Sequence, residues 1–149
     1  MTDLPPHRSW NRGGARPVLA LHCSLAHAGA YRGLAEALHG VTLTAMDFIG
    51  HGKARNWDGV EDYHTAATDD AIALAETLGQ GAPIDLIGHS FGGTVALRIA
   101  ATRADLVRSL TLIEPVFFAA ARAAHAPEWD GFIPDHQEFG TLVAKGQTL

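Results

Sequence analysis

The sequence predicts an α/β fold in which a parallel sheet is flanked by helices. Between residues 17 and 113, strand-like and helix-like segments alternate, and this order is typical of parallel strands joined by right-handed crossovers. The segment Pro17–His22 is apolar without alternation, as strands covered on both faces are. A short apolar run from Pro83 leads into a tight turn with one serine between glycines, and then into a helix.

The first half of the chain supplies two of the expected strands. Residues 1–16 are polar and rich in Pro and Gly, so they are predicted to be a loose lead-in, with Ser9–Trp10 as the remnant of a short strand. After the strand Pro17–His22, apolar residues at helical spacing predict a helix over Tyr31–Leu38. Val41–Met46 is the second strand.

The second half continues the alternation. A turn-rich loop runs from Asp47 to about Gly59, and a helix is expected from near Asp62 to Leu78. The strand that Pro83 opens and the helix after it follow, and Val107–Ile113 is the fourth strand. Beyond Val116 the chain is first alanine-rich and helix-compatible and then has no strand pattern.

Composition excludes several classes of function. The 149 residues carry a net charge of −5 without a basic cluster, which argues against a nucleic-acid partner. No apolar run approaches the roughly 20 residues of a membrane span. The polar N-terminus is not expected to be a secretory signal, and the single Cys23 suits a reducing cytoplasm. Cys23 lies near two of the nine histidines, but no second cluster completes a metal site, so no metal or organic cofactor is expected.

The turn Gly88–His89–Ser90–Phe91–Gly92 fits the G-x-S-x-G nucleophile elbow. Its serine needs a strained backbone, and glycines two residues to either side avoid side-chain clashes. The start of the following helix offers unpaired N–H groups and a partial positive charge, which suit a developing oxyanion. Within such a turn the His89 side chain is too constrained to serve as the base for the serine. The plain alternative is a glycine-rich turn with a capping serine.

Three motifs in the expected order resemble the α/β-hydrolase family, over about residues 17–118. Leu21–Ser24 is similar to the family's oxyanion loop, and Asp47–Ala54 to its D-x-x-G-x-G-x-S loop. Gly88–Gly93 is similar to its elbow, and Leu112–Pro115 to the end of its sixth strand, where a cap often begins. The resemblance divides the chain into residues 1–16, a lead-in; 17–115, the N-terminal half of the core; and 116–149, the start of a cap-like helical region.

The resemblance also implies site roles. Ser90 would be the nucleophile, and the backbone N–H of Phe91 would be one oxyanion donor. The other donor would come from the loop after His22, most simply from Ser24, while His22 would brace that loop. Cys23 stands where the family usually has glycine, so a positive φ at that position would be strained.

The triad is incomplete in the sequence. In this fold an acid and then a histidine follow the serine, and only His125 and His136 come after Ser90. Glu114 is a candidate acid because some family members carry their acid at this strand end. The family's catalytic domains run further, with two more strands that bear the acid and the histidine. The chain is therefore expected to be an incomplete hydrolase core of about four strands, which lacks the C-terminal strands.

The sequence therefore predicts a serine hydrolase that acts on a small acyl substrate, such as an ester, thioester or lactone, through an acyl-Ser90 intermediate. The retained residues do not separate hydrolases from acyltransferases, C–C bond hydrolases or haloperoxidases of the family. The alternative is a non-catalytic module that keeps the elbow as architecture. Without the later strands, Val107–Ile113 becomes an apolar sheet edge, which predicts a homo-oligomer or a complementing chain.

Overall fold

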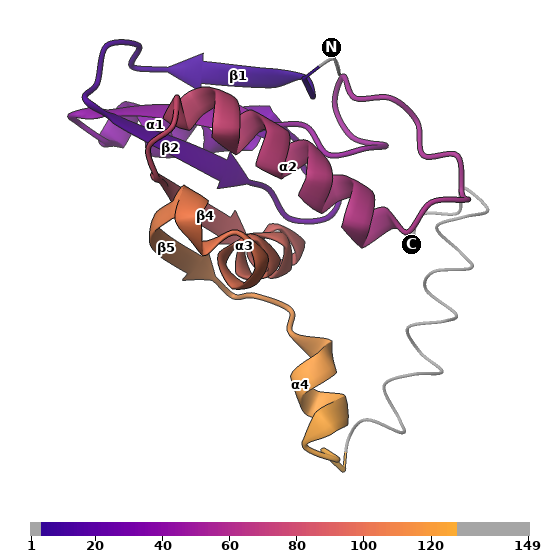
Figure 1. Ribbon diagram of the computed structural model, residues 1–149. Coiled ribbons are helices and arrows are strands. Elements are labelled where there is room, and N and C mark those ends of the chain that lie inside the picture. The colour runs from indigo at the N-terminus through magenta and orange to yellow at the C-terminus, as the bar shows by residue number, and fades with distance from the viewer. Residues whose placement is uncertain (1–3, 128–149) are drawn as a thin grey trace. The chain divides into compact units, whose positions relative to one another are not determined.

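The computed structural model describes residues 4–127, and within them five strands form one sheet in the order β1-β3-β2-β4-β5 (Figure 1). Strands β2 to β5 pair in parallel, and β1 pairs antiparallel with β3. The α/β fold expected from the sequence is confirmed. The strands are β1 (His7–Trp10), β2 (Arg16–Leu21), β3 (Val41–Met46), β4 (Ile84–His89) and β5 (Val107–Ile113).

Strand β1 has a larger part in the sheet than the sequence suggests. Four residues pair with β3, from His7 opposite Met46 to Trp10 opposite Leu43. The hydroxyl groups of Ser9 and Thr44 are hydrogen-bonded at 2.8 Å across the pair. A polar four-residue strand has no apolar signature of its own, so its pairing depends on the neighbouring strand.

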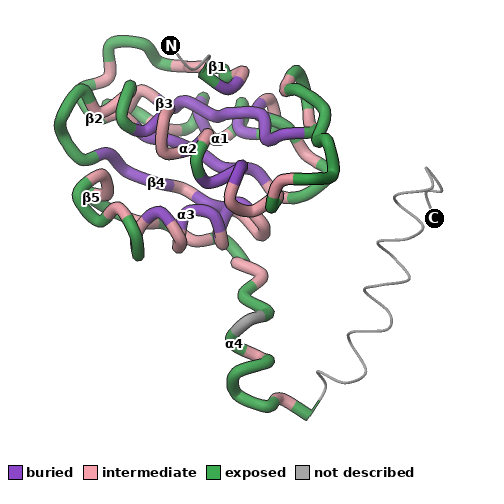
Figure 2. Tube along the Cα trace, turned by 45° about the vertical axis from the view of Figure 1, so that its right-hand side comes forward, coloured by how far each residue is buried: buried purple, intermediate pink, exposed green. Residues whose placement is uncertain are grey.

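Helices cover both faces of the sheet (Figures 1 and 2). On one face α2 (Tyr63–Gly79) and α3 (Phe91–Thr102) bury the larger core, whose sheet residues include Leu19, Leu21 and Leu86. On the other, η1 (Ala28–Tyr31) and α1 (Arg32–Ala37) cover a smaller core that includes Ala20. Successive residues of β2 thus enter opposite cores, and the last four residues of both β2 and β3 are buried (Figure 2).

Two expected helices form close to their predicted bounds. The helix expected at Tyr31–Leu38 is α1, and the 3₁₀ turn η1 precedes it. Helix α2 begins after Asp62, whose carboxylate accepts the Thr65 N–H at 2.7 Å, and ends where Gln80 takes a left-handed conformation. N-capping by aspartate is the ordinary way to satisfy a free N–H at a helix start.

Strand β5 lies at the edge of the described sheet, next to β4. A short 3₁₀ turn, η2 (Ala104–Leu106), precedes it. The first compact unit ends at Val116, and a second begins at Phe117 with α4 (Phe118–Ala123). None of the helices described here is long and apolar enough to cross a membrane.

Candidate active site

Ser90 lies in the turn between β4 and α3 with φ 52° and ψ −114°. This left-handed backbone is unfavourable for a residue with a side chain, so the surrounding contacts must maintain it. A Cβ on Gly88 would lie 2.5 Å from the Gly92 carbonyl oxygen, and one on Gly92 would overlap the Leu21 carbonyl. The two glycines are therefore required by close backbone approach on both sides of the serine.

Backbone hydrogen bonds hold the elbow against both neighbouring strands. The Ser90 N–H donates to the Ile113 carbonyl at 2.9 Å, and the Gly92 N–H to the His22 carbonyl at 3.1 Å. The Gly93 N–H donates to the Ser90 carbonyl at 2.9 Å. Phe91 is the first residue of α3, and its N–H has no acceptor within residues 4–127. One backbone donor thus remains free next to the serine.

The loop after β2 leaves a second donor free. Leu25 donates its N–H to His51 Nε2 at 3.3 Å, and Ala26 donates to the Cys23 carbonyl at 3.3 Å. In the described part of the chain the Ser24 N–H has no acceptor. Leu25, with φ 63°, is the loop residue with positive φ, whereas Cys23 is not in this conformation. The strained positive φ that was considered for Cys23 is therefore found at Leu25, two residues later.

His22 is buried and uses both ring nitrogens for backbone hydrogen bonds. Its Nδ1–H donates to the Cys23 carbonyl at 2.7 Å, and its Nε2 accepts the Phe48 N–H at 3.1 Å. Burial lowers the pKa of His22, against the smaller opposing effect of its bond to the Cys23 carbonyl. A neutral ring with both nitrogens occupied ties two loops together and has no free nitrogen to take the proton of a serine.

The side chain of Phe91 packs in an aromatic cluster. Its ring centroid lies 5.3 Å from Phe48, 5.5 Å from Tyr63 and 5.6 Å from His64. His64 Nε2 is 3.1 Å from the hydroxyl oxygen of Thr94 in α3. The loop after β3, the start of α2 and the start of α3 thereby hold the residue that carries the free N–H.

No acid or base is assembled on the serine among residues 4–127. The Ser90 hydroxyl has no hydrogen-bond partner there, and neither does the His89 ring. Glu114 follows β5 with φ 44°, is exposed, and makes no hydrogen bond or ion pair with a described residue. His125 belongs to the second unit, and His136 lies outside the described residues.

Asp47 and His51 have structural roles in the loop after β3. The buried Asp47 carboxylate accepts the Ala28 N–H at 2.7 Å and the Lys53 N–H at 2.9 Å. A Cβ on Gly52 would overlap this carboxylate. The D-x-x-G-x-G spacing was therefore a usable signal for Asp47. For His51 no sequence signal exists, because its partner Leu25 is 26 residues away.

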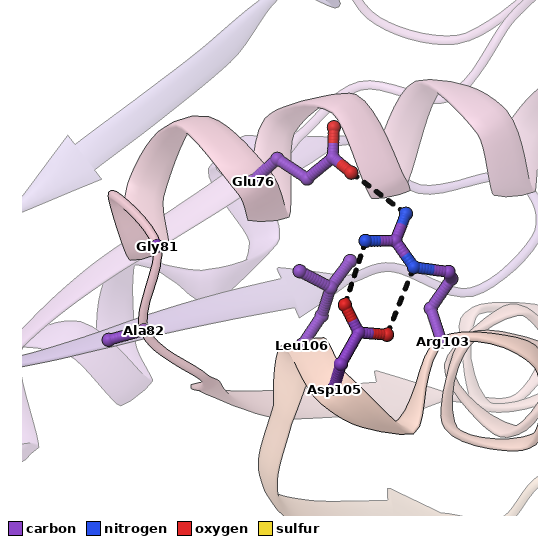
Figure 3. A pocket seen from close by; sticks show the side chains of 6 residues that line it. All are labelled: Glu76, Gly81, Ala82, Arg103, Asp105 and Leu106. Atoms are coloured by element: carbon purple, nitrogen blue, oxygen red, sulfur yellow. Dashed lines mark hydrogen bonds and ion pairs between the residues drawn. The ribbon is translucent and has the colours of Figure 1, made fainter.

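A hollow lies between α2 and η2 (Figure 3). Apart from Glu76 in α2, its lining residues lie in the segments before β4 and β5, so it is at the amino ends of these strands, whereas Ser90 follows the carboxyl end of β4. Arg103 lines it and pairs with Glu76 at 2.8 Å and with Asp105 at 2.9 Å (Figure 3). Sites in open α/β sheets form at the carboxyl ends of strands, so this hollow is not part of the candidate site.

Comparison with known proteins agrees with this geometry. Residues 16–142 match the model of the alpha/beta hydrolase fold family, and the chain belongs to this family. It is 37% identical over 116 residues to lipase LipV of Mycobacterium tuberculosis, covering 76% of this chain and 42% of the lipase. It is 31% identical over 125 residues to human monoglyceride lipase, covering 78% of this chain and 41% of that enzyme.

Among solved structures, a thioesterase domain from the curacin biosynthetic pathway superposes with a TM-score of 0.63 and 27% identity. The match covers 68% of this chain and 37% of that domain. The chain thus spans about two fifths of the length of the relatives that it matches.

Proposed function

We propose that this chain carries the nucleophile and oxyanion half of a serine hydrolase that cleaves an ester, thioester or lactone bond. Membership of the hydrolase family supports the proposal. The names of its relatives, two lipases and a thioesterase domain, support acyl substrates. No organic cofactor or metal enters the reaction.

The proposed reaction has two steps through an acyl-enzyme. Ser90 Oγ attacks the acyl carbonyl while a base takes its proton, and the carbonyl oxygen becomes an oxyanion that accepts from the N–H groups of Phe91 and Ser24. Collapse expels the alcohol or thiol, which receives the proton, and leaves acyl-Ser90. Water then attacks the acyl-enzyme and releases the carboxylic acid.

The observation that carries the proposal is the combination of a strained Ser90 with two free backbone donors. Both donors lie in segments that follow the carboxyl ends of the adjacent strands β2 and β4. His125, His136 or a histidine of a second chain would act as the base, and Glu114 is a candidate to orient it. Turnover of p-nitrophenyl esters and of acyl thioesters, compared between the parent and Ser90→Ala, tests the proposal. Equal rates in both would refute it.

The rival proposal is a non-catalytic module that binds acyl compounds. It is favoured by one observation, that no described imidazole is hydrogen-bonded to Ser90. Calorimetry with a non-hydrolysed acyl compound separates the two. A binding module keeps its affinity in Ser90→Ala and shows no turnover in either form.

We also propose that the free edge of β5 pairs with another strand, from a second copy or from a complementing chain. Unpaired backbone groups along an edge strand are a template for such pairing. For the compartment we propose the cytoplasm, since the only cysteine is a free thiol.

A further inference from the structure

Two histidines form a reciprocal clasp between the loop after β2 and the loop after β3. His22, in the first loop, accepts the N–H of Phe48 from the second loop at 3.1 Å. His51, in the second loop, accepts the N–H of Leu25 from the first loop at 3.3 Å. The two rings lie 5.2 Å apart between their centroids. Each loop therefore supplies one imidazole and one backbone donor to the other.

The remaining ring nitrogens anchor each histidine in its own loop. His22 Nδ1–H donates to the Cys23 carbonyl at 2.7 Å, and His51 Nδ1–H donates to the Ile49 carbonyl at 3.0 Å. Both rings thus have the same tautomer, with a protonated Nδ1 and an accepting Nε2. Tyr63 supports this arrangement from α2, because its hydroxyl donates to the same Ile49 carbonyl at 2.8 Å.

The clasp fixes the two peptide groups on either side of Ser24. A trans peptide is planar, so its C=O and N–H point in opposite directions, and the described chain contains no cis bond. When His22 holds the Cys23 carbonyl, it therefore sets the direction of the Ser24 N–H, which belongs to the same peptide group. His51 holds the next peptide group through the Leu25 N–H and stabilises the positive φ of that leucine.

We propose that His51, acting with His22, is a positioning residue that orients the Ser24 N–H as the second oxyanion donor. The clasp reaches the elbow directly, because the His22 carbonyl accepts the Gly92 N–H at 3.1 Å. This inference rests on the proposed function. It adds a residue that acts through Leu25 and Ser24 and does not touch the substrate.

Protonation of His51 at Nε2 would remove the acceptor for Leu25. The titratable groups around the pair are His22 and His27 from the loop after β2, Asp47 from the end of β3, and Tyr63 from α2, whose hydroxyl lies 3.3 Å from His51 Nδ1. Two protonated rings 5.2 Å apart would also repel each other. The clasp therefore needs an accepting Nε2 on both histidines.

The test measures covalent inactivation by a fluorophosphonate, resolved into its binding constant and its rate constant. His51→Phe fills the space without an acceptor, and His51→Gln restores an acceptor. We expect His51→Phe to lower the rate constant about tenfold or more with little change in binding, since a lost oxyanion donor costs roughly 100-fold or more. We expect His51→Gln to keep the parent rate. His39→Gln, at an exposed histidine after α1, is the matched control.

The inference would be overturned if His51→Phe reacted with the same rate constant as the parent. It would also be overturned if His51→Phe and His51→Gln lost the same share of that rate constant. Amide exchange at Leu25, measured by NMR, gives a readout that needs no reactivity of Ser90. Protection of the Leu25 N–H that is lost in His51→Phe and kept in His51→Gln supports the clasp, and unchanged protection in both variants refutes it. A parent that does not react with the probe contradicts the proposed function, and amide exchange then decides the clasp.

Discussion

The N–H of Ser90 donates to the carbonyl oxygen of Ile113 over 2.9 Å, so the elbow is bonded to the end of the edge strand β5. On its other side, the elbow is bonded through Gly92 to the loop after β2. Ser90 is thus held in an unfavourable backbone conformation by strands on both sides. Substitutions that break these contacts are therefore expected to change the backbone conformation of Ser90, and to affect its reactivity through that change.

Gly92→Ala should unfold or strongly destabilise the protein. The added Cβ would overlap the Leu21 carbonyl group, and backbone atoms of a buried central strand cannot move aside. We expect a loss of about 3 kcal/mol or more in the free energy of unfolding, the upper range for overpacking. Urea denaturation measures it.

Gly33→Ala is the matched control for that variant. Gly33 lies in α1, and no heavy atom is within 4 Å of the position of its Cβ. Alanine in an open helical position is expected to gain roughly 0.5–1 kcal/mol. A Gly92→Ala protein as stable as Gly33→Ala would contradict the close approach described here.

Asp85→Asn should destabilise the protein, because Asp85 connects three strands. This buried carboxylate of β4 accepts from Arg16 of β2 at 2.6 Å and from Arg108 and Ser109 of β5 at 2.7–2.8 Å. The arginines are partly exposed, so we expect a loss of about 2 kcal/mol, below the range for a fully buried pair. Asp69→Asn, at an exposed position of α2, is the control.

The same carboxylate predicts an acid dependence of stability. Its hydrogen bonds to Arg108, Ser109 and Arg16 hold the pKa of Asp85 well below its usual range. Between the pKa of Asp85 in the folded protein and its value of about 3.9 in the unfolded chain, the unfolded state binds more protons. The stabilisation from Asp85 is therefore complete above about pH 4 and is lost as the pH falls. The free energy of unfolding of Asp85→Asn should therefore decline less with falling pH than that of the parent. An equal decline in both proteins would contradict the role given to Asp85.

His22 predicts a second dependence at milder pH. Burial lowers the pKa of His22, so between that pKa and the unfolded value of about 6.5 the unfolded state again binds more protons. The contribution is complete above about pH 6.5 and declines below it. Burial also lowers the pKa of His64, so this residue adds to the same decline in stability below about pH 6.5. Thermal unfolding of His22→Gln from pH 7.5 to 5 should show a smaller decline than the parent, while His39→Gln should match the parent.

Thr111→Lys tests the proposed pairing at the edge of the sheet. Thr111 is exposed on β5, and a lysine on an edge strand opposes the addition of another strand. Sedimentation velocity should show self-association of the parent that the variant weakens. A parent that sediments as a single monomer at all concentrations would exclude a second copy as the partner.

Local patterns in the sequence were sufficient to predict the alternation of elements and the elbow. The run before Ser90 and the glycines around it specify a strand, a tight turn and a helix, and these form as expected. Strand β1 was only suggested, since its pairing with β3 comes from residues more than 30 positions away. Short-range periodicity cannot detect such a contact.

The motif spacing also placed Ser90 in the turn and Phe91 at the start of α3, whereas their roles in the site stay predictions. The contacts of His51 with Leu25 and of His64 with Thr94 join loops and helices distant in the sequence, so no spacing indicates them. The positive φ at Leu25 also follows from such a tertiary contact and not from the residue type.

The most direct test of the central claim is labelling by a fluorophosphonate probe, followed by intact mass and peptide mapping. The account predicts a single adduct, on Ser90, which is absent in Ser90→Ala while the variant stays folded by circular dichroism. Slow labelling would agree with a base that is not yet assembled on the serine. A folded parent that gains no adduct on Ser90, or that is labelled equally after Ser90→Ala, would contradict the claim that Ser90 is the nucleophile.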